Sequence, residues 1–268
     1  MTRPIVALLT DFGTRDHYVG AVKGAILAVC GEATLVDVTH EITPHDVEEA
    51  ALTLERAYAA FPPATVFMAV VDPGVGGSRR AMALEARGRR FVGPDNGLFT
   101  FVLADERDAA MREITNAALL RREVSNTFHA RDVFGPAAGH LACGASLDLL
   151  GPPLREPVLL PMAAAHPRGD REWEAAVVHV DRFGNLTTNL TQRQLEEILS
   201  TVDGDPTRLV VLVEGAVLPL VRTYGDVAEG EPCALVGSST RLEVAANRAD
   251  AARLLSAGRG TRLRLRKL

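Results

Sequence analysis

The segment VVDPGVGGSRR, residues 70–80, places the carboxylate of Asp72 in a glycine-rich loop of the kind that often surrounds a phosphate. The P-loop requires G-x-x-x-x-G-K-[ST], and the dinucleotide fingerprint requires G-x-G-x-x-G at the start of a helix. Neither spacing occurs here, because the glycines are followed by Ser-Arg-Arg and then by a β-like run. The loop therefore favours close approach of an uncharged ligand to the backbone, with Asp72 as an acceptor near Arg79.

Two further polar clusters follow predicted strands. TDFGTRDHY follows the apolar run IVALLT, and THEITPHD follows ATLVDV. In open α/β sheets, ligands bind beyond the carboxyl ends of the strands, so we expect Asp11 and Asp72 to share one crevice. A structural alternative for Asp11 is the N-cap of a helix that starts near Asp16.

Two later segments also carry polar residues of interest. NTFHARDVFGP places His129 just before a run of small residues, although a single loop histidine is more often a surface or capping residue. VDRFGNLTTN offers Asp181, Phe183 and Asn185, and its structural alternative is an ordinary turn built from Asp, Gly and Asn.

The elements that must position these residues alternate between apolar runs and amphipathic stretches from residue 4 to about residue 150. Apolar residues at helical spacing predict a helix through residues 19–29, and a second helix is expected from about Asp46. TVFMAVV, AMALEA and RRFVGPDNG are typical of strands, and VFGPAAGHLACGAS of a helix rich in small residues. The pattern predicts an α/β domain with a mostly parallel, Rossmann-like sheet.

The composition changes in GPPLREPVLLPMAAAHPRGD, where prolines interrupt the alternation and indicate a linker. We therefore predict two domains, 1–165 and 166–268. The second contains an expected helix at residues 192–199 and the short runs RLVVLV, AVLPLV, CALVG and RLEVAA, followed by the alternating tail RLRLRKL. These runs predict a C-terminal β-barrel domain.

Composition and charge exclude several classes of protein. The chain has 29 Lys and Arg against 34 Asp and Glu, a net charge of −5, and no basic patch beyond the short tail, so nucleic-acid binding is not expected. The N-terminal apolar run is too short for a signal peptide and no run is long enough for a membrane span, so we expect a cytoplasmic protein without membrane contact.

The three cysteines form no CxxC motif and lie far apart among apolar neighbours. We expect Cys30, Cys143 and Cys233 to be buried, inert thiols, with neither a disulfide framework nor a zinc site.

The polar segments occur in a recognisable order over nearly the whole chain. They are TDFGTRDHYVGAVKG, VDPGVGG with its trailing arginine, GPDNG, TFHARDVFGPAAGHLA, DRFGNLTTN, TYGD and GSSTRLEVAANRADAA. Together they resemble the S-adenosylmethionine (SAM) hydroxide adenosyltransferase family, which is related to the bacterial fluorinase and chlorinase. Several motifs in two domains make this match far more specific than any single motif.

The resemblance implies an N-terminal α/β domain, a C-terminal β-barrel domain and a homotrimer. In that trimer, SAM binds between the N-terminal domain of one subunit and the C-terminal domain of its neighbour. The implied reaction is hydrolysis of SAM by attack of water at ribose C5′, which gives adenosine and L-methionine without a cofactor or a metal.

The resemblance also assigns residues to the site. In the hydrolase branch an Asp, an Arg and a His hold the nucleophilic water, and these motif positions are Asp72, Arg79 and His129 here. The implied substrate contacts are Asp11 at the ribose hydroxyls, Asp181 and Ser238 at the methionine, Phe183, Asn185 and Tyr224 around the adenine, and Glu243. Some relatives hold the methionine carboxylate with an arginine where this chain has Ser239, which leaves that contact to backbone groups or to Arg241.

The chemistry of a sulfonium makes the nucleophile the difficult partner. Attack at C5′ expels a neutral thioether, which needs neither an acid nor a metal, whereas water is a weak nucleophile with a pKa of about 15.7. Either His129 receives the proton, or water loses it only as the carbon–oxygen bond forms while the three side chains fix an in-line geometry.

A SAM-dependent halogenase and a non-catalytic SAM or nucleoside binder are the alternatives. In the halogenase branch the positions of Asp72, Val75 and Ala130 are Tyr, Thr and Ser, and a loop is inserted after the glycine segment. This chain has none of these features, and a carboxylate at position 72 would repel an anionic nucleophile. A pure binder would not need Asp72, Arg79 and His129 together.

Overall fold

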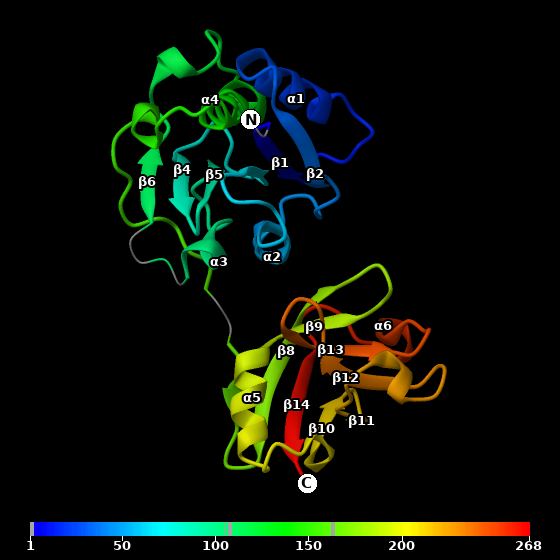
Figure 1. The fold of residues 1–268 in the computed structure, drawn as a ribbon. Helices are drawn as coiled ribbons and strands as arrows, with labels where there is room; N and C mark the ends of the chain where they lie inside the picture. The colour runs from blue at the N-terminus through cyan, green and yellow to red at the C-terminus, as the bar shows by residue number, and fades with distance from the viewer. Residues whose placement is uncertain (1–2, 105, 107–108, 162–163) are drawn as a thin grey trace. The chain divides into compact units, whose positions relative to one another are not determined.

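The computed structural model describes residues 3–104, 106, 109–161 and 164–268. The chain divides into two compact units, Met1–Pro161 and Met162–Leu268, and this division lies close to the boundary predicted near residue 165. Figure 1 shows the helices and strands of the two units. Each unit encloses its own hydrophobic core.

The N-terminal unit alternates strands and helices in its first half. Its elements are β1 (Ile5–Thr10), α1 (Tyr18–Val29), β2 (Thr34–Thr39), α2 (Val47–Tyr58), β3 (Val66–Val70), β4 (Ala81–Ala86), β5 (Arg89–Pro94), α3 (Thr100–Leu103), β6 (Ala110–Glu113), η1 (Ala117–Leu119), the π-helical turn η2 (Ala130–Phe134), α4 (Gly135–Ala142) and η3 (Leu147–Leu150).

These strands form one sheet in the order β2-β1-β3-β5-β4-β6. The pairs β1–β2, β1–β3 and β3–β5 are parallel, and β4 is antiparallel to both β5 and β6. The α/β prediction is therefore confirmed, with the parallel strands grouped at one side of a mixed sheet. The order differs from the 3-2-1-4-5-6 order of doubly wound dinucleotide folds, and the Rossmann-like designation stays a prediction.

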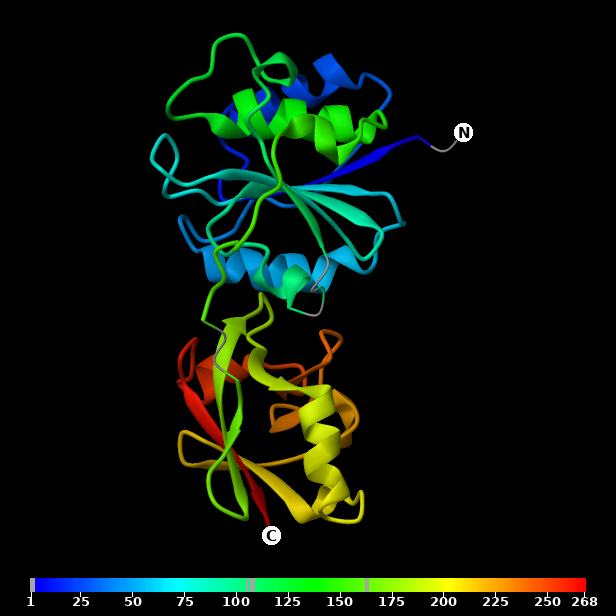
Figure 2. The same cartoon turned by 90° about the vertical axis from the view of Figure 1, so that its left-hand side faces the viewer.

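Helices cover both faces of this sheet, with α1 and α4 on one face and α2 and α3 on the other (Figure 2). α1 and α4 pack closely because α4 carries glycines on the contact side: a Cβ atom at Gly139 would lie 2.9 Å from the Cβ atom of Val29. No helix among the described residues combines the length and the apolar character that a membrane span requires.

The C-terminal unit is rich in strands, as the sequence predicts. Its elements are β7 (His166–Pro167), β8 (Glu172–Val180), β9 (Leu186–Thr191), α5 (Gln192–Ser200), η4 (Pro206–Arg208), β10 (Leu209–Val213), β11 (Ala216–Pro219), η5 (Tyr224–Asp226), β12 (Pro232–Val236), β13 (Arg241–Ala246), α6 (Ala251–Leu254) and β14 (Arg262–Lys267).

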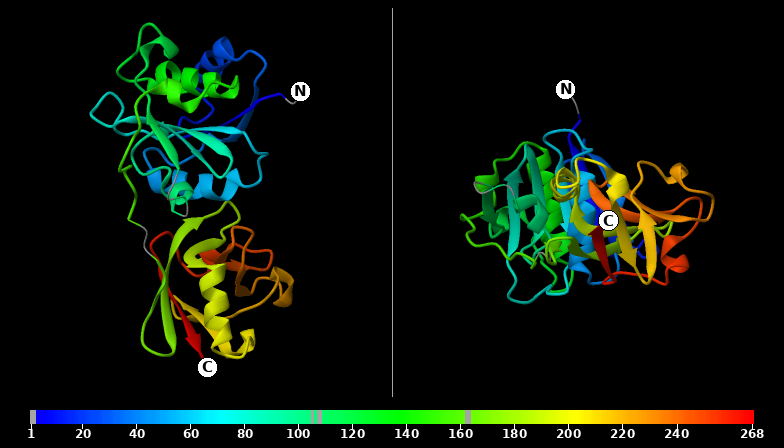
Figure 3. Two further views of the ribbon diagram at one scale, coloured as in Figure 1. Left: turned by 60° about the vertical axis from the view of Figure 1, so that its left-hand side comes forward. Right: turned by 90° about the horizontal axis from the view of Figure 1, so that it is seen from below.

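The strands form a sheet in the order β11-β10-β14-β8-β9-β13-β12, with β7 paired to β8. All its named strand pairs are antiparallel. A bridge between Leu220 and Ala234 brings the chain after β11 against β12, so the sheet is nearly closed and barrel-like. Helix α5, yellow in Figure 3, packs along this sheet, and a capping box of Thr191 and Gln194 fixes its start.

The cysteine prediction is wrong for two of the three residues. Cys30 and Cys143 form a disulfide that joins the C-terminal ends of α1 and α4, and Cys143 is exposed. Their spacing carries no sign of this pairing, because the two cysteines lie 113 positions apart and meet only when the two helices pack. Cys233 is free and buried, as expected.

Reduction of this disulfide should lower the free energy of unfolding by about 2–4 kcal/mol, because the bond restricts a long loop in the unfolded chain. Urea unfolding with and without dithiothreitol measures the loss. Cys143→Ser should show the same loss and no further response to dithiothreitol. A wild-type transition that does not move on reduction would contradict the bond.

Candidate active site

The parallel strands deliver two of the predicted acids to one cavity. Asp11 follows β1 and Asp72 follows β3, and both line a cavity of about 640 Å³ in the N-terminal unit. His129, the N-cap of η2, lines the same cavity. The sequence-based expectation that Asp11 and Asp72 share a crevice is therefore confirmed.

Arg79 is not among the residues that line the cavity, and it binds the Asp72 carboxylate. Its Nε donates to Asp72 Oδ1 at 2.9 Å and to Oδ2 at 3.0 Å, and its Nη2 donates to Oδ2 at 2.5 Å. The Arg79 and Asp72 side chains are only 11% and 6% exposed, so this charge-assisted pair is largely shielded from water. The guanidinium also stacks over the ring of Phe134, 5.1 Å from its centroid.

The same guanidinium reaches His129. Arg79 Nη2 lies 2.8 Å from His129 Nδ1. Because a guanidinium can only donate, Nδ1 must accept, and the neutral ring carries its proton on Nε2. Burial and the Arg79 charge lower the pKa of His129, although Asp72 and Asp132 act in the opposite direction. The arrangement thus favours a neutral imidazole with an Nε2–H group left to donate.

The glycine loop serves the protein's own packing. Gly76 has a φ of +74°, and a Cβ atom there would lie 2.2 Å from the carbonyl oxygen of Asn126. The loop after β3 can therefore lie against the segment that leads to His129. The sequence pattern predicts close approach of a ligand to these glycines, but at Gly76 the neighbour is the protein backbone.

Asp11 does not cap a helix. Helix α1 starts later, with His17 as an N-cap that makes no side-chain cap bond. Instead Asp11 Oδ2 accepts the backbone N–H of His45 at 2.9 Å. His45 holds a φ of +70°, an uncommon conformation for a residue other than glycine. The contact fixes one oxygen of Asp11 and leaves the carboxylate at the cavity.

Three aromatic side chains on the cavity wall were not predicted as site residues: Phe12, Tyr18 and Phe128. Phe128 packs edge to face against Phe12 and Tyr18, with centroid distances of 6.2 Å and 5.3 Å. The available signal was their position inside polar segments of a chain that is only 5% aromatic. They give the cavity an apolar wall beside its charged groups.

The C-terminal unit has a separate cavity of about 740 Å³ that brings Phe183, Asn185 and Tyr224 together. Phe183 is 75% exposed, which is unusual for a large aromatic residue. The Tyr224 hydroxyl donates to Glu243 Oε1 at 2.9 Å. Burial and this contact with Glu243 raise the pKa of Tyr224 to about 12. Four of the predicted substrate-contacting residues thus form one group.

The remaining two predicted residues lie outside both cavities. The Asp181 carboxylate accepts the backbone N–H groups of Phe183 and Asn185 at 2.8 and 2.9 Å and the Asn185 side-chain amide at 2.9 Å. These are the contacts of the structural alternative, a turn held by its own aspartate. Ser238 is exposed in the turn between β12 and β13. Their roles at a methionine stay predictions.

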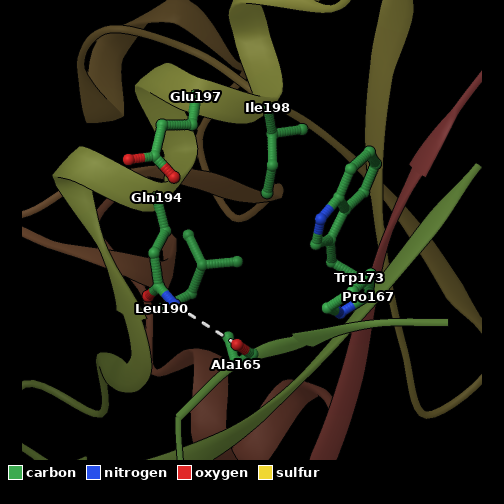
Figure 4. A pocket seen from close by; sticks show the side chains of 7 residues that line it. All are labelled: Ala165, Pro167, Trp173, Leu190, Gln194, Glu197 and Ile198. Atoms are coloured by element: carbon green, nitrogen blue, oxygen red, sulfur yellow. Dashed lines mark hydrogen bonds between the residues drawn. The ribbon is translucent and has the colours of Figure 1, made fainter.

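A smaller pocket of about 210 Å³ in the C-terminal unit contains none of the predicted residues (Figure 4). It lies between α5 and the strand residue Trp173, and Gln194 closes one side by donating to the carbonyl of Ala165 at 3.2 Å. Its lining is mainly apolar apart from Gln194 and Glu197, and none of the residues predicted to hold the water lies there.

One group of potential metal ligands occurs among the described residues, namely Cys30, Glu32 and Cys143. Its two sulfur atoms are bonded to each other, so they are not available as thiolates. None of the three lines the cavity that contains Asp72.

Comparisons with known proteins agree on one family. The family model of the SAM hydroxide adenosyltransferase N-terminal domain matches residues 6–151, and that of the C-terminal domain matches residues 175–264. The (R)-S-adenosyl-L-methionine hydrolase of Salinispora tropica is 40% identical, over 98% of this chain and 97% of its own. The fluorinase of an Actinoplanes species is 31% identical, over 93% of both chains.

A solved structure is similar to this chain over nearly its whole length. An uncharacterized conserved protein from Thermotoga maritima has a TM-score of 0.91 and 35% sequence identity, and the match covers 98% of this chain and 100% of that one. The similarity therefore extends over both units.

The ring of His129 should titrate below its usual value of about 6.5, because burial and Arg79 disfavour the imidazolium. The neutral form should therefore persist as the pH falls through that value. In Arg79→Gln the pKa should rise, since a positive neighbour is lost while Asp72 remains. NMR titration of the His129 ring measures both, with the exposed Arg193→Gln as control. A ring that titrates alike with and without Arg79 would contradict the contact.

Proposed function

The chain belongs to the SAM hydroxide adenosyltransferase family, and on this basis we propose that it hydrolyses S-adenosyl-L-methionine to adenosine and L-methionine. The observation that best supports this proposal is that Arg79 hydrogen-bonds both Asp72 and His129 at one cavity. The Salinispora relative is named for the (R) form of SAM, and we propose the same form as the substrate here.

The nucleophilic water is proposed to lie between Asp72 and the Nε2 edge of His129. The His129 Nε2–H group would donate to the water oxygen, since Nδ1 is engaged by Arg79. Asp72 would accept one of the water's hydrogens. The other lone pair of the water oxygen is then directed at C5′, and such alignment contributes about 7–11 kcal/mol to lowering a barrier.

The proton is proposed to leave late and toward Asp72. His129 could accept a proton on Nδ1 only by giving up its bond to Arg79, and its lowered pKa opposes the charged form. As the carbon–oxygen bond forms, the carbon–sulfur bond breaks and its electron pair moves to sulfur. Methionine leaves as a neutral thioether, and one proton passes from water through Asp72 to solvent. This balance requires no metal and no cofactor.

The ribose is proposed to lie against Asp11, whose free carboxylate oxygen would accept from the 2′- and 3′-hydroxyls. The aromatic wall beside it suits the apolar parts of the substrate. We also propose that the protein acts in the cytoplasm.

Halogenation fits the site less well. The fluorinase relative is less similar than the hydrolase relative, and the Asp72 carboxylate would repel a halide. Hydrolysis uses the same carboxylate as a hydrogen-bond acceptor for water.

We propose a homotrimer in which the cavity of the C-terminal unit of one subunit completes the N-terminal cavity of its neighbour. Each unit by itself contains only some of the residues that are expected to contact SAM. Asp11 and the water-binding residues belong to one unit, whereas Phe183, Asn185 and Tyr224 belong to the other. The adenine would stack on Phe183 and Tyr224.

Asp72→Asn should lower kcat about 10²- to 10⁴-fold while the protein stays folded, because an amide has no negative charge with which to receive the proton. Adenosine release from the (R) and (S) forms of SAM, followed by chromatography, measures this. Asp203→Asn, an exposed residue of the other unit, is the control.

Three results would contradict the proposal. One is unchanged turnover in Asp72→Asn. Another is halogenated adenosine formed in the presence of chloride or fluoride, which would indicate a halogenase. The third is intact SAM recovered from the wild-type protein with no adenosine, which would indicate a binding protein.

The intersubunit site predicts complementation between two inactive variants. Asp72→Asn damages the N-terminal unit, and the double variant Phe183→Ala, Tyr224→Ala damages the C-terminal unit. In equal co-expressed mixtures, random assembly should restore about a quarter of the sites. A site is active only when its N-terminal unit and the neighbouring C-terminal unit are both intact, and each is intact about half of the time. A mixture of Asp72→Asn with His129→Ala should restore none. Equal activity in both mixtures would refute a shared site.

A further inference from the structure

A chain of polar groups, buried at Thr10 and His40 and partly exposed at Asp37 and Lys23, lies next to the loop that carries Asp11. Thr10, the last residue of β1, is 1% exposed, and His40, which follows the neighbouring strand β2, is 4% exposed. Thr10 Oγ1 lies 2.8 Å from His40 Nδ1. His40 Nε2 lies 3.1 Å from Asp37 Oδ1, close but imperfectly aligned, and Asp37 Oδ2 accepts from Lys23 Nζ at 2.7 Å.

The charge of Asp37 determines which groups donate and which accept in these hydrogen bonds. Asp37 is a carboxylate at neutral pH: burial opposes its charge, but the contacts with Lys23 and His40 prevail and lower its pKa. A carboxylate facing Nε2 favours the tautomer with the proton on Nε2. His40 Nδ1 then accepts the Thr10 hydroxyl, and the Thr10 oxygen accepts the backbone N–H of Phe12 at 3.3 Å.

This order of hydroxyl, imidazole and carboxylate has the form of a nucleophile triad, but its location excludes that role. Thr10 is buried and does not line the cavity of Asp11 and Asp72. The buried pair of Thr10 and His40 is also a costly way to fill space, because apolar side chains would need no hydrogen-bond partners. We therefore look for its role in the backbone segment that these side chains hold in place.

The chain's contacts converge on the segment that begins with Asp11. The Thr10 hydroxyl holds the N–H of Phe12, and the His40 carbonyl accepts the N–H of Gly13 at 2.7 Å. His45 lies in the same segment between β2 and α2 as His40, and its backbone N–H donates to Asp11 Oδ2. Gly13, with a φ of +64°, allows the backbone to turn between these anchors. The carboxylate of Asp11 is thus fixed by its own contact and by the two residues after it.

We propose that Thr10, His40 and Asp37 are positioning residues that hold Asp11 in the orientation required to recognise both ribose hydroxyls. Lys23 on α1 anchors the outer end of the network. The inference rests on the proposed function, because it takes Asp11 as the ribose contact. The substrate class it specifies is a ribonucleoside, with discrimination against the 2′-deoxy form.

The test compares Thr10→Val, which keeps the shape and removes the hydroxyl, with Thr10→Ser, which restores it. Calorimetry gives the ratio of the dissociation constants for 2′-deoxyadenosine and adenosine. The wild type should favour adenosine by about tenfold or more, as a hydrogen bond to a charged group implies. Thr10→Val should lose most of this preference and raise KM for SAM more than it lowers kcat, whereas Thr10→Ser should keep it.

Thr65→Val is the matched control, since Thr65 is equally buried and donates to the backbone carbonyl of Pro62 just before β3. It should lose stability and keep the preference for adenosine. The inference is overturned if Thr10→Val keeps the wild-type ratio, if Thr65→Val loses it too, or if the wild type shows no preference. A wild type that binds adenosine selectively but releases none from SAM would instead count against the proposed hydrolysis alone.

Discussion

The guanidinium of Arg79 is the group on which the rest of the N-terminal site depends, because it can only donate hydrogen bonds. It donates to the Asp72 carboxylate and to His129 Nδ1 at 2.5–3.0 Å, so Nδ1 carries no proton. One cation therefore orients a carboxylate and fixes the tautomer of an imidazole. Water activation in such a site is a matter of orientation more than of basicity.

Close backbone contacts in the N-terminal unit bring Asp72, Arg79 and His129 together. The Asp72 loop and the segment before His129 meet where Gly76 leaves room for the Asn126 carbonyl. On one face of the sheet, the glycines of α4 let it approach α1 (Figure 2). The Cys30–Cys143 bond joins the C-terminal ends of these two helices. Side chains from distant segments are held by a rigid frame, as in-line attack demands.

The electrostatics of the cavity match a cationic substrate and a neutral nucleophile. A sulfonium leaves as an uncharged thioether, so the site needs no acid for the leaving group, and its carboxylates suit hydroxyls and water. The same carboxylate at position 72 disfavours a halide as the nucleophile, because two negative charges repel each other. The second group of residues, around Phe183 and Tyr224, provides flat apolar surface of the kind that a purine stacks on.

The sequence by itself determined the α/β and barrel-like units, most element positions, and the meeting of Asp11 with Asp72, because hydrophobic periodicity and strand-end geometry are local properties. Motif order identified the family, and it predicted Asp72, Arg79 and His129 as the residues that hold the water. Only the tertiary structure decided that Nδ1 of His129 accepts from Arg79, that Gly76 faces Asn126, and that Cys30 bonds Cys143. These depend on which distant segments pack together, and no spacing along the chain encodes that directly.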